Sequence, residues 1–173
     1  MTVKGHIIFT IANSILIQHF IFSKILYHDD WWRIIPISII TCLLPDIDNP
    51  KSTIGSKIKI FSYLVNQIFG HRGFTHSLLS LISFGFIIFS INLQINNIIY
   101  IKLGLIIGYL SHIIADILTP LGVPLLWPYK KKYKLPLINK NFMKEDIFCY
   151  LYLIFSLYLL YPICNNIIMK IFV

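Results

Sequence analysis

The sequence predicts an all-α protein, a polytopic membrane helix bundle with about five apolar segments and one interfacial amphipathic helix in a single domain over 1–173. Two observations carry this prediction. Hydrophobic residues make up 57% of the chain and charged residues 13%, against about 25% charged in soluble domains. The ranges 5–23, 73–101 and 147–169 contain no Asp, Glu, Lys or Arg, and a membrane span needs about 20 apolar residues.

The expected spans cover 7–26, 31–45, 77–93, 98–118 and 147–169. The first follows Lys4 without a small-residue cleavage site after Ile17, so we interpret it as an uncleaved span. The second is short and contains Arg33 and Pro36. It is therefore either a short span or a re-entrant segment.

An amphipathic helix is expected at about 54–69, between the second and third spans. Apolar residues recur there at steps of three and four, opposite two lysines and an asparagine. This pattern is typical of a helix that lies on a membrane surface. Such a helix would cover whatever the two ends of its loop enclose.

The basic residues are distributed unequally between the two sides that five spans would create. One side receives eleven of the fifteen: Lys4, Lys51, Lys57, Lys59, Arg72, Lys130, Lys131, Lys132, Lys134, Lys140 and Lys144. The positive-inside rule makes that side, and with it the N-terminus, cytoplasmic. The cluster at 130–134 is interpreted as an anchor to anionic lipid, so the bilayer is the expected partner and no nucleic acid is.

His112 and Asp116 form a candidate metal-binding pair near the end of the fourth span. Four residues apart on a helix, they lie on one face, one turn removed. Imidazole and carboxylate ligands suit zinc or a similar divalent metal, which requires at least three protein ligands.

Further ionisable groups reach the same side of the predicted bundle from other helix ends. Because such groups are costly near a membrane, their gathering indicates a shared site. His19 and His28 lie mid-span or on the far side and are excluded. The expected metal ligands are His6, Asp46, His71, His76, His112 and Asp116.

Structural roles are the alternative for each group taken singly. Asp46 can cap a helix end or begin an Asx-turn, and Thr75 can be the N-cap of the third span. Asp116 can form an ion pair with Arg72. The turn-forming segment 119–124 can shape a pocket wall or only end the fourth span.

Three motifs closely resemble the YdjM family of bacterial inner-membrane proteins, which are described as metal-dependent hydrolases. They are LLPDIDNPKS at 43–52, FGHRGFTHS at 69–77 and GYLSHIIADILTP at 108–120. The resemblance extends from Gly5 to about Pro128. It implies an inner-membrane location, a metal site at the quoted His and Asp positions, and control of the gene by LexA in the DNA damage response.

The His112 to Asp116 spacing is also distantly similar to zinc-dependent phospholipases C. Those enzymes carry a second pair, His-x-x-x-Glu, whereas the one glutamate here, Glu145, has no histidine four residues before it. A site of three zinc ions is therefore not expected.

The sequence thus favours a membrane-embedded metal-dependent hydrolase that acts at the cytoplasmic interface. It is expected to cleave an ester or phosphoester bond in a lipid-like substrate. Asp48 is the expected general base, and Arg72 is expected to hold an anionic group. Two alternatives stay open. One is a metal-ion or proton transporter, and the other is a non-catalytic scaffold with a structural metal held by four protein ligands.

Overall fold

The protein is a helical bundle with its polar groups gathered at one end. The structure, a computed structural model, describes residues 1–20, 32–92, 98–138 and 142–171; in the last helix it describes the side chains of 143–159. Lys24, His28, Trp31 and Lys140, on which parts of the prediction depend, lie outside these residues. The described elements are helices, with one isolated antiparallel bridge between Val123 and Tyr133, which confirms the all-α class.

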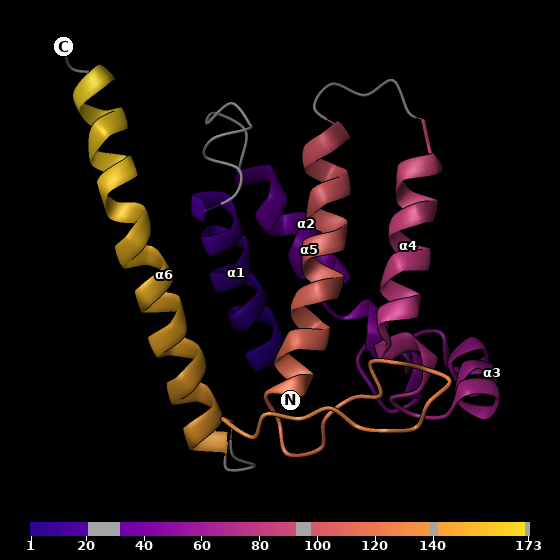
Figure 1. Cartoon of the computed structure of the whole chain (residues 1–173). Helices are drawn as coiled ribbons and strands as arrows, with labels where there is room; N and C mark the ends of the chain where they lie inside the picture. Colours follow the sequence, from indigo (N-terminus) through magenta and orange to yellow (C-terminus); the bar gives the residue numbers. More distant parts are fainter. Residues whose placement is uncertain (21–31, 93–97, 139–141, 172–173) are drawn as a thin grey trace.

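Figure 1 shows α6, α1, α5 and α4 running roughly alongside one another, with the N-terminus at the lower end and the C-terminus at the upper end. The short helix α3 lies at the lower end of the view, and the short helix α2 lies at mid-height beside α5. The bounds are α1 Val3–Phe20, α2 Ile34–Thr41, η3 Leu44–Asp48, α3 Lys59–Phe69, η4 Phe74–His76, α4 Leu78–Ser90, α5 Ile98–Ile117 and α6 Phe142–Ile171, where η denotes a 3-10 helix.

Among the described residues, α5 is the one helix long and apolar enough to cross a membrane by length and composition, and α4 is a shorter apolar helix. The second expected span differs most from the prediction. Its helix, α2, has eight residues and so measures about 12 Å, less than half of the roughly 30 Å of bilayer hydrocarbon. Pro45 follows closely, and the chain continues as the 3-10 helix η3. Five spans are therefore not seen.

A close approach of α2 to α5 places the polar end of α2 beside that of α5. A Cβ atom on Gly108 would overlap the carbonyl of Ser38, and one on Gly104 would lie 2.9 Å from the carbonyl oxygen of Ile34. These glycines, four residues apart, present the same face of α5 to α2. The contact sets the position of η3, which follows α2.

Helix α3 packs on η3 through its polar side. Ser62 is buried, and the amide of Asn66 donates to the backbone carbonyl of Asp48 over 2.6 Å. Gly55 fits beneath the helix, where a Cβ atom would overlap the carbonyl of Asn49. The helix begins at Lys59 and not at 54, because 54–58 form turns whose backbone N–H groups bond to nearby carbonyls.

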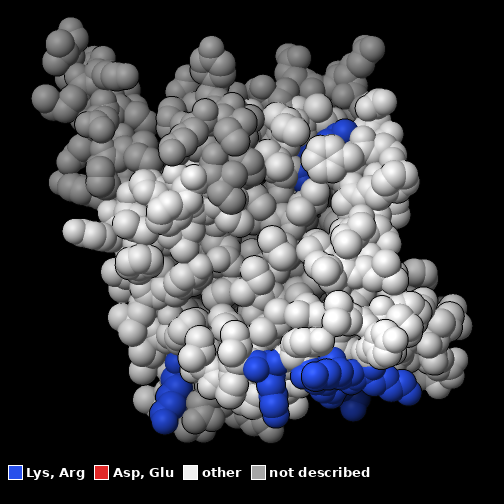
Figure 2. Space-filling view, viewed as in Figure 1, with Lys and Arg blue, Asp and Glu red and all other residues white. Residues whose placement is uncertain are grey.

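Lysine and arginine side chains gather along one edge of the molecule. In Figure 2 most of them line the lower edge, the end at which α3 and the loop after α5 lie, and a further one lies near the upper end. The basic edge is thus the end of the bundle that carries the polar helix termini.

Candidate metal centre

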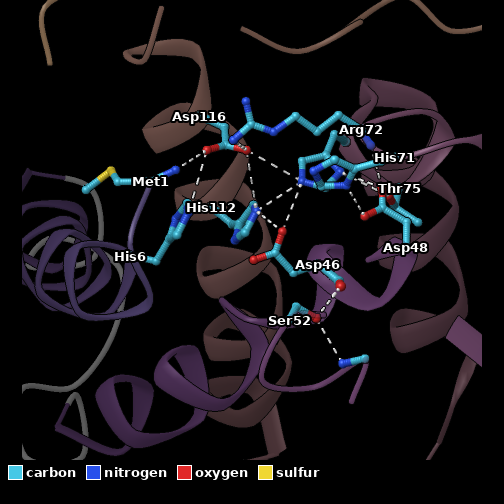
Figure 3. Close-up of polar contacts among 12 residues, drawn as sticks. Met1, His6, Asp46, Asp48, Ser52, His71, Arg72, Thr75, His112 and Asp116 are labelled. Atoms are coloured by element: carbon cyan, nitrogen blue, oxygen red, sulfur yellow. Dashed lines mark hydrogen bonds and ion pairs between the residues drawn. The ribbon is translucent and has the colours of Figure 1, made fainter. Parts of the chain in front are cut away.

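Four separate elements bring their polar ends to one place in the bundle (Figure 3). His6 lies in the first turn of α1, Asp46 in η3, His76 in η4, and His112 and Asp116 in the last turns of α5. All are buried except Asp46, whose side chain is 21% exposed. The structure therefore brings together five of the six expected ligands.

Hydrogen bonding fixes which nitrogen of His112 faces the site. Its Nδ1 atom lies 2.5 Å from the backbone carbonyl oxygen of Cys42. A carbonyl oxygen only accepts, so Nδ1 must donate. In the neutral ring, Nε2 then carries the lone pair that a metal needs, an arrangement common among metal-binding histidines.

His76 is oriented in the same way by Thr75 and Asp48. Its Nδ1 atom lies 3.0 Å from the Thr75 hydroxyl oxygen and 3.2 Å from Asp48 Oδ2. The Thr75 hydroxyl also lies 2.6 Å from Asp48 Oδ2 and donates to it, which leaves Nδ1 of His76 as the second donor. The Nε2 atom of His76 consequently points toward His112 and Asp116.

The facing atoms are spaced as a small metal ion requires. His76 Nε2 lies 3.2 Å from His112 Nε2, 3.6 Å from Asp116 Oδ2 and 3.7 Å from Asp46 Oδ1. His112 Nε2 lies 3.9 Å and 3.7 Å from the same two oxygens. Tetrahedral ligands about 2.0–2.1 Å from zinc stand roughly 3.3 Å apart. The donor set and spacing fit a divalent ion.

His6 contributes to a second, overlapping group of ligand atoms. Its ring stacks on that of His112 with centroids 4.0 Å apart, and its Nε2 lies 3.6 Å from Asp116 Oδ1. His6, Asp46 and His112 can therefore also share an ion. Each carboxylate also lies near a histidine of the other group: Asp116 near His6, and Asp46 near His76.

His71 lies apart from the groups that can share an ion. Its side chain is 48% exposed, and its Nδ1 atom lies 3.0 Å from Asp48 Oδ1. It contacts the centre through Asp48, which also accepts from the backbone N–H of Arg72. Burial alone would raise the pKa of Asp48, but its hydrogen bonds with His71, His76 and Thr75 hold it well below the usual range.

Both oxygens of Asp48 thus accept hydrogen bonds from groups that surround the centre. A buried carboxylate with this many donors stays ionised. In this position Asp48 orients His76, and Asp46 is the carboxylate on the more open side of the site.

Arg72 reaches the centre from the loop between α3 and η4. Its backbone has a positive φ of 57°, an uncommon conformation for a residue other than glycine. Nη2 lies 2.8 Å from Asp116 Oδ2, so the ion pair considered from the sequence is present. On the other side of Asp116, the Met1 amino group lies 3.2 Å from Oδ1. In the described part of the chain, Nε and Nη1 of Arg72 are buried without a hydrogen-bond partner.

Two of the other structural alternatives, the cap of α4 and the Asx-turn, are decided by hydrogen bonds. Ser77, and not Thr75, caps α4, because its side chain accepts from the backbone N–H of Ser80. Asn49 forms the Asx-type contact, accepting from the backbone N–H of Lys51 over 3.1 Å, so Asp46 is not needed for that turn.

Two groups that organise the centre were not expected from the sequence. They are the carbonyl of Cys42 and the hydroxyl of Thr75. A backbone carbonyl carries no signal in the sequence. Thr75, directly before His76, could have been recognised as a partner of the histidine rather than as a cap.

The chain is similar to known inner membrane proteins. The family model described as YdjM inner membrane protein matches residues 1–170. The chain belongs to the YdjM family. It is 39% identical over 172 residues to "Inner membrane protein YdjM" of Escherichia coli (strain K12), covering 96% of this chain and 86% of the relative. This YdjM-family chain is accordingly a membrane protein.

A more distant relative is "Uncharacterized protein YvsG" of Bacillus subtilis (strain 168). It is 37% identical over 141 residues, 82% of each chain. No solved structure matches the chain significantly.

Proposed function

We propose that this YdjM-family protein is a membrane-embedded metal-dependent hydrolase of ester or phosphoester bonds. The observation that carries the proposal is the pair of Nε2 atoms of His76 and His112. They face each other and two carboxylates in a buried site, and each ring is held by a partner at Nδ1. This arrangement supports metal binding more strongly than a structural role for two histidines.

Zinc is the ion that we expect, because two imidazoles and carboxylate oxygens at these distances suit it. When bound, a divalent ion would lower the pKa of a water molecule and polarise the bond to be cleaved. His76, His112 and Asp116 would hold it, with His6 and Asp46 available to this or a second ion. His71 then either supports Asp48 through their hydrogen bond or, if its side chain turns inward, becomes a further metal ligand.

The remaining residues have distinct roles in this proposal. Asp46, which is partly exposed, takes the proton from the attacking water if the ion leaves one of its oxygens free. Asp48 acts as a positioning residue, because its oxygens already accept hydrogen bonds from Thr75 and Arg72. Two nitrogens of Arg72, Nε and Nη1, have no hydrogen-bond partner among the described residues and can donate to the anionic oxygen of a phosphoester.

The site belongs, in this proposal, at the cytoplasmic face of a multi-pass protein. The basic edge of the molecule lies at the same end as the site (Figure 2), which supports a cytoplasmic N-terminus. α2 then belongs to a short segment that returns the chain across the bundle, so that η3 places Asp46 at that face. A site at the level of the lipid headgroups would be reached most directly by a lipid-like substrate.

The metal content and the activity of the purified protein test the proposal together. We expect about one or two zinc ions per chain and hydrolysis of p-nitrophenyl esters, bis-p-nitrophenyl phosphate or mixed phospholipids. His112→Ala and Asp116→Ala should lose both, while His19→Ala, on the same α1 helix as His6, should keep both. Bound metal without any turnover would favour the scaffold with a structural metal; absence of bound metal would overturn the proposal.

Transport is a second candidate because α1 buries polar side chains within the bundle. Asn13, Ser14 and Gln18 are buried, and the Gln18 amide has no hydrogen-bond partner among the described residues. Polar residues inside a membrane can mark the path of an ion. Zinc or proton uptake into proteoliposomes, reduced by Gln18→Leu, would favour transport over hydrolysis.

A further inference from the structure

Helix α3 has an unusual distribution of polar and apolar side chains. It packs on η3 through its polar side, with Ser62 buried, and it exposes large apolar side chains on its other faces. The exposed fractions are 83% for Ile60, 56% for Phe61, 50% for Leu64 and 71% for Ile68. A helix that turns its apolar side outward requires an apolar partner there.

Two adjoining shallow depressions, open to the outside, lie along this exposed side. The larger, about 530 Å³, is lined by Lys57, Ile58, Lys59, Ile60, Phe61 and Leu64. The smaller, about 310 Å³, shares Lys59, Ile60 and Leu64 with it and is completed by Pro50 and Tyr63. Together they form an apolar groove with two lysines, which we call the α3 groove.

We propose that the α3 groove binds an anionic phospholipid, with an acyl chain on its apolar floor and the phosphate between Lys57 and Lys59. Both lysines are exposed, and no acidic side chain in the described part of the chain lines the groove. The groove also lies at the end of the bundle that carries the basic edge (Figures 1 and 2). Apolar length and adjacent positive charge match a lipid with an anionic headgroup better than the polar surface of a protein.

The groove is linked to the metal centre by short hydrogen bonds. Asn66 of α3 donates to the carbonyl of Asp48 over 2.6 Å, and the Ser52 hydroxyl donates to the carbonyl of Asp46 over 2.7 Å. A lipid in the groove would therefore hold α3 against η3, the element that carries Asp46 and Asp48. This proposal stands whether or not the metal centre hydrolyses a substrate.

Photo-crosslinking in nanodiscs tests the lipid and its site directly. The full chain is reconstituted in phosphatidylcholine with a small fraction of photoactivatable phosphatidylglycerol or phosphatidylcholine, and the crosslinked peptides are mapped. We expect phosphatidylglycerol to label residues 50–64 at least fivefold more than phosphatidylcholine does. Equal labelling by the two lipids, or crosslinks between two copies of the chain at α3 in place of lipid, would overturn the proposal.

A matched pair of double variants separates the groove from general surface charge. Lys57→Gln with Lys59→Gln should lower labelling by phosphatidylglycerol at least fivefold. Lys131→Gln with Lys132→Gln removes the same charge from another exposed part of the basic edge and should leave labelling unchanged. An equal loss in both variants would show that α3 meets only the average surface of the bilayer, which contradicts a discrete site.

Discussion

The Nε2 atoms of His76 and His112 face each other over 3.2 Å, a separation that a shared proton or a shared metal ion can hold. Burial lowers the pKa of His76, but the hydrogen bonds with Asp46 and Asp48 outweigh it and raise the pKa to about 9. At pH 7 and without metal, His76 is therefore protonated, and its second N–H can donate to His112. A metal ion must replace that proton.

Zinc affinity should consequently rise with pH. One proton leaves His76 when the ion binds below about pH 9, so the association constant should increase about tenfold per pH unit between pH 6 and 8 and level off near pH 9. Isothermal titration calorimetry in buffers of different ionisation enthalpy measures the released proton. A pH-independent affinity would show that His76 is not a ligand.

Loss of the partners that orient His76 should weaken metal binding without removing a ligand. Thr75→Val removes the hydroxyl beside its Nδ1 atom, and Asp48→Asn replaces the carboxylate there with a neutral amide. Each should lower zinc affinity about 10–100-fold. Competition with a chromogenic chelator measures the change. Thr53→Val, an exposed threonine, serves as the control, and equal affinities in all of these variants would contradict the proposed positioning.

Gly55→Ala should destabilise the protein, because the added methyl group would overlap the carbonyl of Asn49 beneath α3. We expect a loss of about 1–3 kcal/mol in the free energy of unfolding, seen as a lower Tm in detergent. Gly85→Ala is the matched control: its methyl group would meet only Ile106 Cδ1 at 3.8 Å, so helix propensity should make it neutral or stabilising. Equal Tm values for the two variants would argue against tight packing of α3.

Reporter fusions should place both sides of the centre in the cytoplasm. Lys57 follows η3, and Lys132 lies in the loop after α5, so alkaline phosphatase fused at either should be inactive and green fluorescent protein fluorescent. Opposite results at the two positions would separate Asp46 from His112 by a membrane and contradict one shared centre.

Much of the candidate centre was predictable because its candidate ligands lie at the ends of helices. The predicted span 98–118 located α5, Ile98–Ile117, almost to the residue, and the spacing of His112 and Asp116 placed both on one face of it. The N-terminus of α1 and the His76 segment could be assigned to the same end by counting crossings.

The sequence predicted α2 and the position of His71 less well. The apolar composition of 31–45 does not show where backbone hydrogen bonding changes, and α2 ends at Thr41 before the 3-10 helix that contains Pro45. His71 was assigned because it precedes the third expected span and so reaches the same side as the other ligands, yet the turn with Arg72 at positive φ directs it to Asp48. Local backbone geometry of this kind is not visible in residue spacing.

The centre draws its ligands from α1, η3, η4 and α5, and this order has a consequence for biosynthesis. A nascent chain that has emerged only as far as His76 carries His6 and Asp46 but lacks both ligands from α5. An ion can be captured fully only after the ribosome has passed Asp116 and α5 has joined α2 through Gly108. Metal loading would then report that α5 has been inserted and has packed against α2.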